Sequence, residues 1–146
     1  QSITAHSLPS GTSFARESWL EIIITDTVNT ILYQSGVVAS NSEELDLTDD
    51  DLLLFTSTLL DEMGEITRFV SDAHNINNKS LMAFSNSYHT YRVEIPLDYR
   101  GEIQIQARML FRSFKPSSLV SHPNLLQNLP IIEMEILSKN ISSKNL

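Results

Sequence analysis

The sequence predicts an all-β fold, an immunoglobulin-like antiparallel β-sandwich with a long polar loop and a short helix near the C-terminus. Apolar and polar residues alternate in several short runs, as they do in strands with one buried face. Turn-forming residues separate these runs. The sequence has no pattern of a long amphipathic helix and no glycine-rich phosphate-binding motif. It also has no cysteine, which excludes the Cys–Trp–Cys pattern of a true immunoglobulin domain.

The size and charge of the chain limit its class. Its 146 residues fit one domain. We expect a β-sandwich over residues 1–137, in which residues 1–13 form the loop that leads into it, and a polar C-terminal tail over residues 138–146. The net charge of −8 argues against a nucleic-acid partner, because phosphate binding needs clustered Lys and Arg. No apolar run approaches the ~20 residues of a membrane-spanning helix. Because the sequence starts at Gln1 without an initiating Met, we expect it to be a piece of a longer product.

The clearest strand pattern lies in the C-terminal half. In residues 91–97 (YRVEIPL) and 102–112 (EIQIQARMLFR), every second residue is apolar. The short DYRG sequence between them predicts a turn, so the two runs are expected to form a hairpin. In the second run the alternation assigns Arg108 and Arg112 to the water-facing side. It assigns to the buried side Ile103, Ile105, Ala107, Met109 and Phe111.

The remaining elements are expected to be shorter. Residues 18–25 are rich in β-branched and aromatic residues, and a turn at 26–29 separates them from a second strand at 30–36. Further along the chain we expect an acidic turn or single helical turn at 48–51, a hairpin across 61–64, a long polar loop at 71–86, a short helix within 119–129 that Pro123 interrupts, and a last strand at 129–137.

Four aspartates form the candidate metal site. Calcium prefers carboxylate and other oxygen ligands at regular intervals around a turn glycine. An EF-hand loop counted from Asp46 fails, because Asp51 stands where that glycine is needed. A less regular calcium site remains open, and the alternative is a solvated acidic loop. The candidate ligands are Asp46, Asp49, Asp50 and Asp51.

No catalytic constellation is present in the sequence, and we do not expect an enzyme. The histidines show no HxH or HExxH spacing, and there is no GxSxG or SxxK motif. The lack of cysteine excludes thiolate catalysis and covalent haem attachment through CxxCH within this chain. The single tryptophan, Trp19, lies in a strand-like run, so we expect it to pack in the core rather than to stack on a sugar.

Several stretches together resemble a known family. They are "AHSLPSGTSFARESWLEI", "LFTSTLLDEMGE", "YRVEIPLDYRGEIQIQARMLFRSFKP" and "LPIIEMEI". This pattern resembles the cysteine-free β-sandwich region at the C-terminal end of bacterial multihaem c-type cytochromes, and it extends from Ala5 to about residue 137. In that family a segment like GHSFPTG follows the CxxCH motifs. Residues 6–11 (HSLPSG) match this segment, with Ala5 where glycine is usual.

The resemblance implies a role for His6 and a partner for the chain. His6 would be a distal axial ligand to a haem c that is held by another segment or chain, and the alternative is an ordinary loop histidine. The sandwich would be a non-catalytic module of an exported, periplasmic or extracellular electron-transfer protein, and it would pack on or dock the haem-bearing part. Exposed strand edges would also allow a homo-oligomer. The alternative function is a free-standing exported adhesion or carbohydrate-binding β-sandwich, with calcium bound by the acidic loop.

Overall fold

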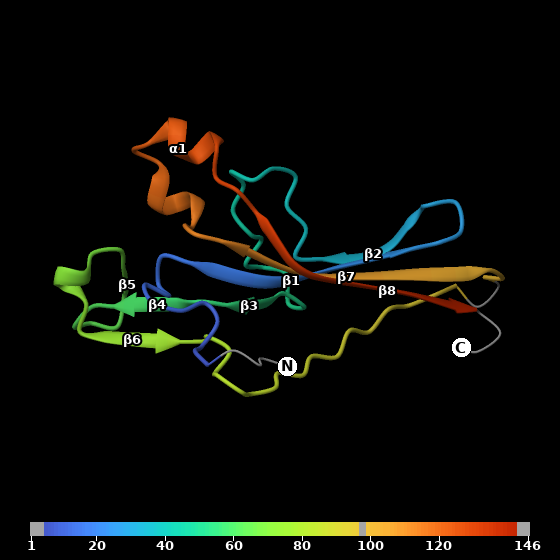
Figure 1. Ribbon diagram of the computed structural model, residues 1–146, viewed down its shortest axis with the longest axis horizontal. Coiled ribbons are helices and arrows are strands. Elements are labelled where there is room, and N and C mark those ends of the chain that lie inside the picture. Colours follow the sequence, from blue (N-terminus) through green and yellow to red (C-terminus); the bar gives the residue numbers. More distant parts are fainter. Residues whose placement is uncertain (1–4, 97–98, 143–146) are drawn as a thin grey trace.

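The expected all-β class is confirmed by the computed structural model, which describes residues 5–96 and 99–142 and forms two antiparallel sheets in a sandwich-like arrangement (Figure 1). The large sheet has the order β2-β1-β7-β8, and β3 pairs with the free part of the β1 edge that β2 uses. The small sheet has the order β5-β4-β6. The strands are β1 (Glu17–Thr25), β2 (Ile31–Ser35), β3 (Leu53–Phe55), β4 (Ser57–Leu60), β5 (Ile66–Thr67), β6 (Asn75–Asn78), β7 (Glu102–Arg112) and β8 (Ile132–Ser142).

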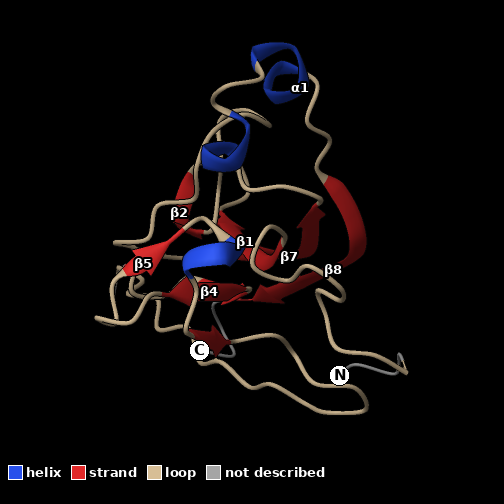
Figure 2. Cartoon of the chain, turned by 90° about the vertical axis from the view of Figure 1, so that its left-hand side faces the viewer, coloured by secondary structure: helices blue, strands red, loops and turns tan. Residues whose placement is uncertain are grey.

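Three short helical elements complete the fold. They are the 3-10 turns η1 (Val70–Asp72) and η2 (Pro116–Leu119) and the helix α1 (Pro123–Gln127). Figure 2 shows α1 at one end of the molecule, and η2 packs against α1 and lines a groove with β4. The expected short helix is present, but Pro123 begins it instead of interrupting it. Proline suits the first helical position, because the amide hydrogen that it lacks has no partner within the helix there.

The two sheets are joined where one extended stretch passes from the first to the second. β3 and β4 are separated only by Thr56, and β3 pairs with β1 whereas β4 pairs with β5 and β6. The buried Thr56 hydroxyl donates to the carbonyl of Arg16 at 2.7 Å, and the amide of Ser57 donates to the carbonyl of Ser13 at 3.2 Å. The segment that leads into β1 is thereby fixed at the junction of the two sheets. The expected hairpin across residues 61–64 is confirmed by the pairing of β4 with β5.

β1 is the central strand, and both of its faces are covered. One face carries Glu17, Trp19 and Glu21, which pair across the sheet with Arg112, Leu110 and Arg108. Trp19, Leu110 and Leu45 form a buried cluster on this face. The assignment of Arg108 and Arg112 to a water-facing side is therefore wrong, since Arg112 is 0% exposed and Arg108 is half-buried. Alternation separates two faces, but it does not show that residues 36–52 cover the polar one (Figure 1).

Arg112 is held by charge and by hydrogen bonds at once. Its Nε donates to a Glu17 carboxylate oxygen, and its Nη1 donates to the carbonyls of Asn41 and Glu43 at 3.2 and 2.6 Å. Its guanidinium carbon also lies 5.2 Å from the centre of the Trp19 ring, within cation–π range. Burial raises the pKa of the Glu17 carboxyl, and Arg112 opposes that rise. A buried ion pair of this kind depends on such additional bonds to offset the loss of hydration.

The expected strand at residues 91–97 is not a strand. Residues 87–96 run extended below the large sheet without strand pairing (Figure 1), and Leu97 lies outside the described residues. The expected hairpin is wrong for a physical reason, because β1 and β8 occupy both edges of β7. The alternation still predicts the facing of the side chains. Tyr91, Val93 and Ile95 pack on the core cluster of Ile22, Ile24 and Ile103, and the residues between them are exposed.

Two further expectations are corrected. Residues 138–142 are not part of a polar tail, because they continue β8 and pair with β7 as far as Ser142 opposite Glu102. Residues 143–146 of the expected tail lie outside the described residues. The long loop expected at 71–86 contains β6, whose asparagine-rich sequence has low strand propensity but pairs with β4 along its whole length.

We expect Arg112→Ala to lower the free energy of unfolding by about 3–5 kcal/mol, because it leaves the Glu17 carboxylate buried without its partner. Urea unfolding followed by circular dichroism measures this change. The matched control is Arg92→Ala, since Arg92 is exposed and its loss should cost less than about 0.5 kcal/mol. A loss for Arg112→Ala no larger than that of a surface pair, about 1 kcal/mol, would contradict the structural role of this residue.

Candidate functional site

The loop at residues 6–11 is tied to the body of the protein by its own backbone and by Arg16. Leu8 and Leu81 exchange two backbone hydrogen bonds of 2.8 Å each. Pro9 is fully buried, and Arg16 Nη1 donates to the carbonyl of Ser10 at 2.9 Å. Gly11 ends the loop with a φ of +70°, which residues with a side chain rarely adopt. The loop is therefore anchored on both sides of Pro9.

His6 lies at the exposed end of this anchored loop. Its Nδ1 is 3.1 Å from the carbonyl oxygen of Ser7. A carbonyl only accepts hydrogen bonds, so this contact favours the tautomer with the proton on Nδ1 and the lone pair on Nε2. A histidine that ligates a metal commonly has its other ring nitrogen fixed in this way. Its chemistry therefore fits a ligand to a haem iron supplied from outside this chain.

Exposed apolar side chains lie in the segment that pairs with the loop. Leu81 pairs with Leu8, and Met82, Phe84 and Tyr88 lie one, three and seven residues after Leu81. These three side chains are 61, 71 and 88% exposed. Large apolar groups that the chain leaves exposed on one segment can mark an interaction surface. We call His6, Met82, Phe84 and Tyr88 the N-terminal face. The sequence does not mark the apolar members of this face, because they lie within or next to a stretch whose polar composition predicts a loop.

The other three histidines belong to other segments of the fold. His74 Nδ1 is 3.4 Å from the carbonyl of Asp72, and His122 comes directly before α1. His89 stacks edge-on against Tyr91 with ring centres 4.6 Å apart, and its Nε2 is 3.9 Å from Asp51. Within residues 5–96 and 99–142, no group of three or more His, Cys, Asp or Glu side chains is placed to hold a metal ion.

The acidic loop uses its carboxylates within the chain. Asp46 accepts from the amide and hydroxyl of Thr48, and these bonds hold the pKa of Asp46 below its usual range. Asp49 accepts from the hydroxyl of Ser35 at 2.7 Å and the amide of Gly36 at 3.0 Å. Asp51 accepts from the hydroxyl of Tyr33 at 2.6 Å. Asp46, Asp49 and Asp51 lie on two consecutive turns, 46–49 and 49–52, and each one accepts from donors of this chain.

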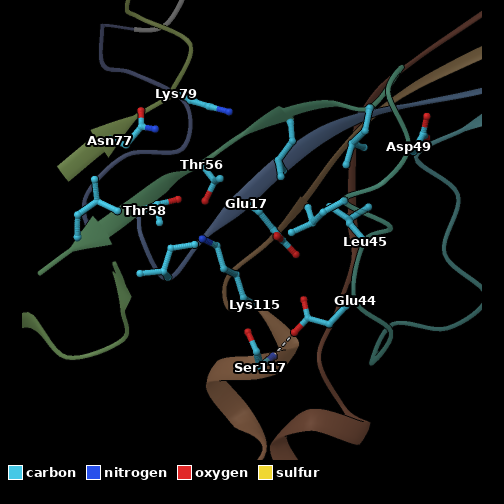
Figure 3. A pocket seen from close by; sticks show the side chains of 15 residues that line it. Glu17, Glu44, Leu45, Asp49, Thr56, Thr58, Asn77, Lys79, Lys115 and Ser117 are labelled. Carbon is cyan, nitrogen blue, oxygen red and sulfur yellow. Dashed lines mark hydrogen bonds between the residues drawn. The ribbon is translucent and has the colours of Figure 1, made fainter. Parts of the chain in front are cut away.

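A groove of about 510 Å³ opens between β3, β4 and η2. Lys115 extends into it (Figure 3). Its Nζ donates to the carbonyl of Ser57 at 3.0 Å. Burial lowers the pKa of Lys115, although Glu17 and Glu44 oppose this shift. The Glu44 carboxylate accepts from the amide of Ser117. These polar groups join η2 and the acidic loop to the sheets, so we assign them a structural role and not a catalytic or binding one. The sequence carried no motif that singles out Lys115 or Glu17.

The prediction that Trp19 packs in the core is confirmed. The ring is completely buried, and its Nε1 donates to the carbonyl of Gly36 at 2.9 Å. The single tryptophan of the chain therefore offers no surface for stacking on a sugar. The adhesion or carbohydrate-binding alternative stays a prediction.

The comparisons with known proteins concern fold. No family model and no curated protein matches this chain. The crystal structure of a penta-heme cytochrome c552 from Thermochromatium tepidum is similar to it, with a TM-score of 0.64 and 18% sequence identity. The match covers 93% of this chain and 33% of that chain, so this chain spans about a third of the cytochrome's length. A β-rich fold of this kind therefore occurs within a penta-heme cytochrome. No helix in the described part of this chain has the length and apolar character needed to cross a membrane.

We expect millimolar calcium to leave the melting temperature unchanged, because donors within the chain already bind Asp46, Asp49 and Asp51. A ligand that binds only the folded state raises the melting temperature by mass action. Differential scanning fluorimetry with calcium, and with magnesium as control, measures the shift. An increase of several degrees with calcium alone would establish the calcium site.

Proposed function

We propose that this chain is the non-catalytic β-sandwich module of a multihaem c-type cytochrome, and that it packs against the haem-bearing part of that protein. The similarity of nearly the whole chain to one third of a penta-heme cytochrome carries this proposal. Because the chain has no cysteine, any haem c would be attached to another segment or chain. The segment HSLPSG at residues 6–11 adds the resemblance to the family.

The N-terminal face is the surface that we propose for docking. Haem is a flat apolar macrocycle, and a protein that covers it needs apolar side chains and few charges. Met82, Phe84 and Tyr88 supply such side chains, on the segment whose Leu81 pairs with Leu8, two residues from the exposed His6. The paired backbones of Leu8 and Leu81 hold both segments at one place (Figure 1). Docking would remove these apolar groups from water and so stabilise the complex.

His6 is the residue that we propose as the distal axial ligand. Imidazole is a common ligand of haem iron, and a fixed loop lowers the entropy cost of placing it. The chain would contribute position and shielding, whereas the haems of the other part would carry the electrons. This role implies export to the periplasm or the cell exterior, where haem c proteins are assembled.

We expect His6→Ala, introduced into the complete polypeptide with its haem, to convert one low-spin haem to a high-spin or differently ligated form. The reason is that alanine has no atom that can ligate the iron. Electron paramagnetic resonance and absorption spectra of the oxidised protein report this change. His74→Ala is the matched control, since His74 is also exposed but lies at the far end of the small sheet. Identical spectra for His6→Ala and the unmodified protein would rule out ligation by His6.

Docking through the N-terminal face is tested separately from ligation. We expect Phe84→Asp in the complete polypeptide to release the module from the haem-bearing part, because the carboxylate resists burial against an apolar partner. Aspartate tolerates the φ of +54° at this position, so the fold should be preserved. Small-angle X-ray scattering should then show a larger radius of gyration.

The control for this experiment is Phe69→Asp, because Phe69 is 68% exposed but lies beside η1. That substitution should leave the radius of gyration unchanged. Equal values for both variants and the unmodified protein would contradict docking through the N-terminal face.

A further inference from the structure

β8 is a long and open edge strand. It has 11 residues, and the first nine are exposed. β7 pairs with its inner side, and no other strand in the described part of the chain pairs with its outer side. Natural proteins commonly protect such an edge by short length, proline or a covering loop. β8 contains no proline, and Leu137 at its middle is 67% exposed. An edge of this kind is suited to strand addition.

The charges on β8 are complementary to a second copy of the same strand. Residues 132–142 have Leu137 at their centre. In an antiparallel pair with a two-fold axis at this residue, each Glu135 lies opposite Lys139 of the other copy, and the two Leu137 side chains meet. Glu135, Leu137 and Lys139 lie on one face of the strand, because side chains alternate along it. Opposite charges at directly facing positions stabilise a strand pair.

Glu135 and Lys139 have no ion-pair partner among the described residues. The neighbouring Glu133 differs, since Arg108 Nη1 lies 3.4 Å from it. The irregular pairing with β7 falls before Glu135, so the stretch from Glu135 onwards is regular. The two charges thus lie on the part of the edge that is best able to pair.

We propose that two copies of this chain associate through β8 in antiparallel register about Leu137. The large sheets of the two copies then form one continuous sheet, with two Glu135–Lys139 pairs across the new junction. This interface uses β8 and not the N-terminal face, so it is independent of the proposed haem-bearing partner. A dimer can form whether or not His6 ligates a haem.

Charge exchange tests the register. Analytical ultracentrifugation of the purified 146-residue chain should show a monomer–dimer equilibrium. Lys139→Glu places two glutamates opposite each other at both ends of the pair, and Glu135→Lys does the same with lysines. Each single variant should dimerise at least tenfold more weakly than the unmodified chain. An equimolar mixture of the two variants restores opposite charges at both positions, so it should form a heterodimer with about the unmodified affinity.

The mixture also guards against misfolding, because two misfolded chains would not restore a specific complex. Arg68→Glu is the control for net charge, since Arg68 is exposed beside β5 in the small sheet. It should leave the dissociation constant within about threefold of the unmodified value. An unmodified chain that stays monomeric at about 100 μM would overturn the proposal. So would a mixture that stays as monomeric as its components, or β8 amides that are protected from exchange only when a haem-bearing partner is present.

Discussion

The buried ion pair between Arg112 and Glu17 is the interaction on which the rest of the structure depends. It joins the two central strands of the large sheet, β1 and β7, and extends through Arg112 to the carbonyls of Asn41 and Glu43. One guanidinium therefore fixes the loop that covers the polar face of the sheet. Two apolar side chains at these positions could also be buried, but they would not donate hydrogen bonds to the carbonyls of Asn41 and Glu43. The face of β1 that carries Trp19 is covered as a result, and Trp19 is enclosed.

The position of His6 follows from this core. Arg16 directly precedes Glu17, and it reaches back to the carbonyl of Ser10 in the N-terminal loop. The Thr56 hydroxyl holds the carbonyl of Arg16 at the junction of the two sheets. The loop is thus connected to the core by only a few bonds. A functional group on a loop that a rigid scaffold positions is a common arrangement in proteins, and the N-terminal face has this form.

The sequence predicts the all-β class and the facing of side chains well, but it predicts poorly which distant segments pair or cover one another. The alternation correctly predicts that the side chains of Tyr91, Val93 and Ile95 face the core. It does not predict that this segment lacks a strand partner, because pairing depends on residues that are distant in the sequence. The alternation predicts an exposed Arg112, because nothing in residues 102–112 shows that residues 36–52 fold over this side chain. The polar residues at the end of β8 predict a tail from the sequence alone, whereas in the structure they pair with β7. His6 is a candidate ligand only through the family resemblance of residues 6–11. Its apolar neighbours were missed, because the pairing of Leu8 with Leu81 is invisible in the sequence.

The central claim is that the N-terminal face covers a haem that another part of the protein carries. A crystal structure of the complete polypeptide, with its haem groups attached, tests this claim most directly. We expect a haem in contact with Met82 or Phe84, with its iron bound by Nε2 of His6. A structure in which the N-terminal face contacts only solvent, or a complete polypeptide that carries no haem, would contradict it.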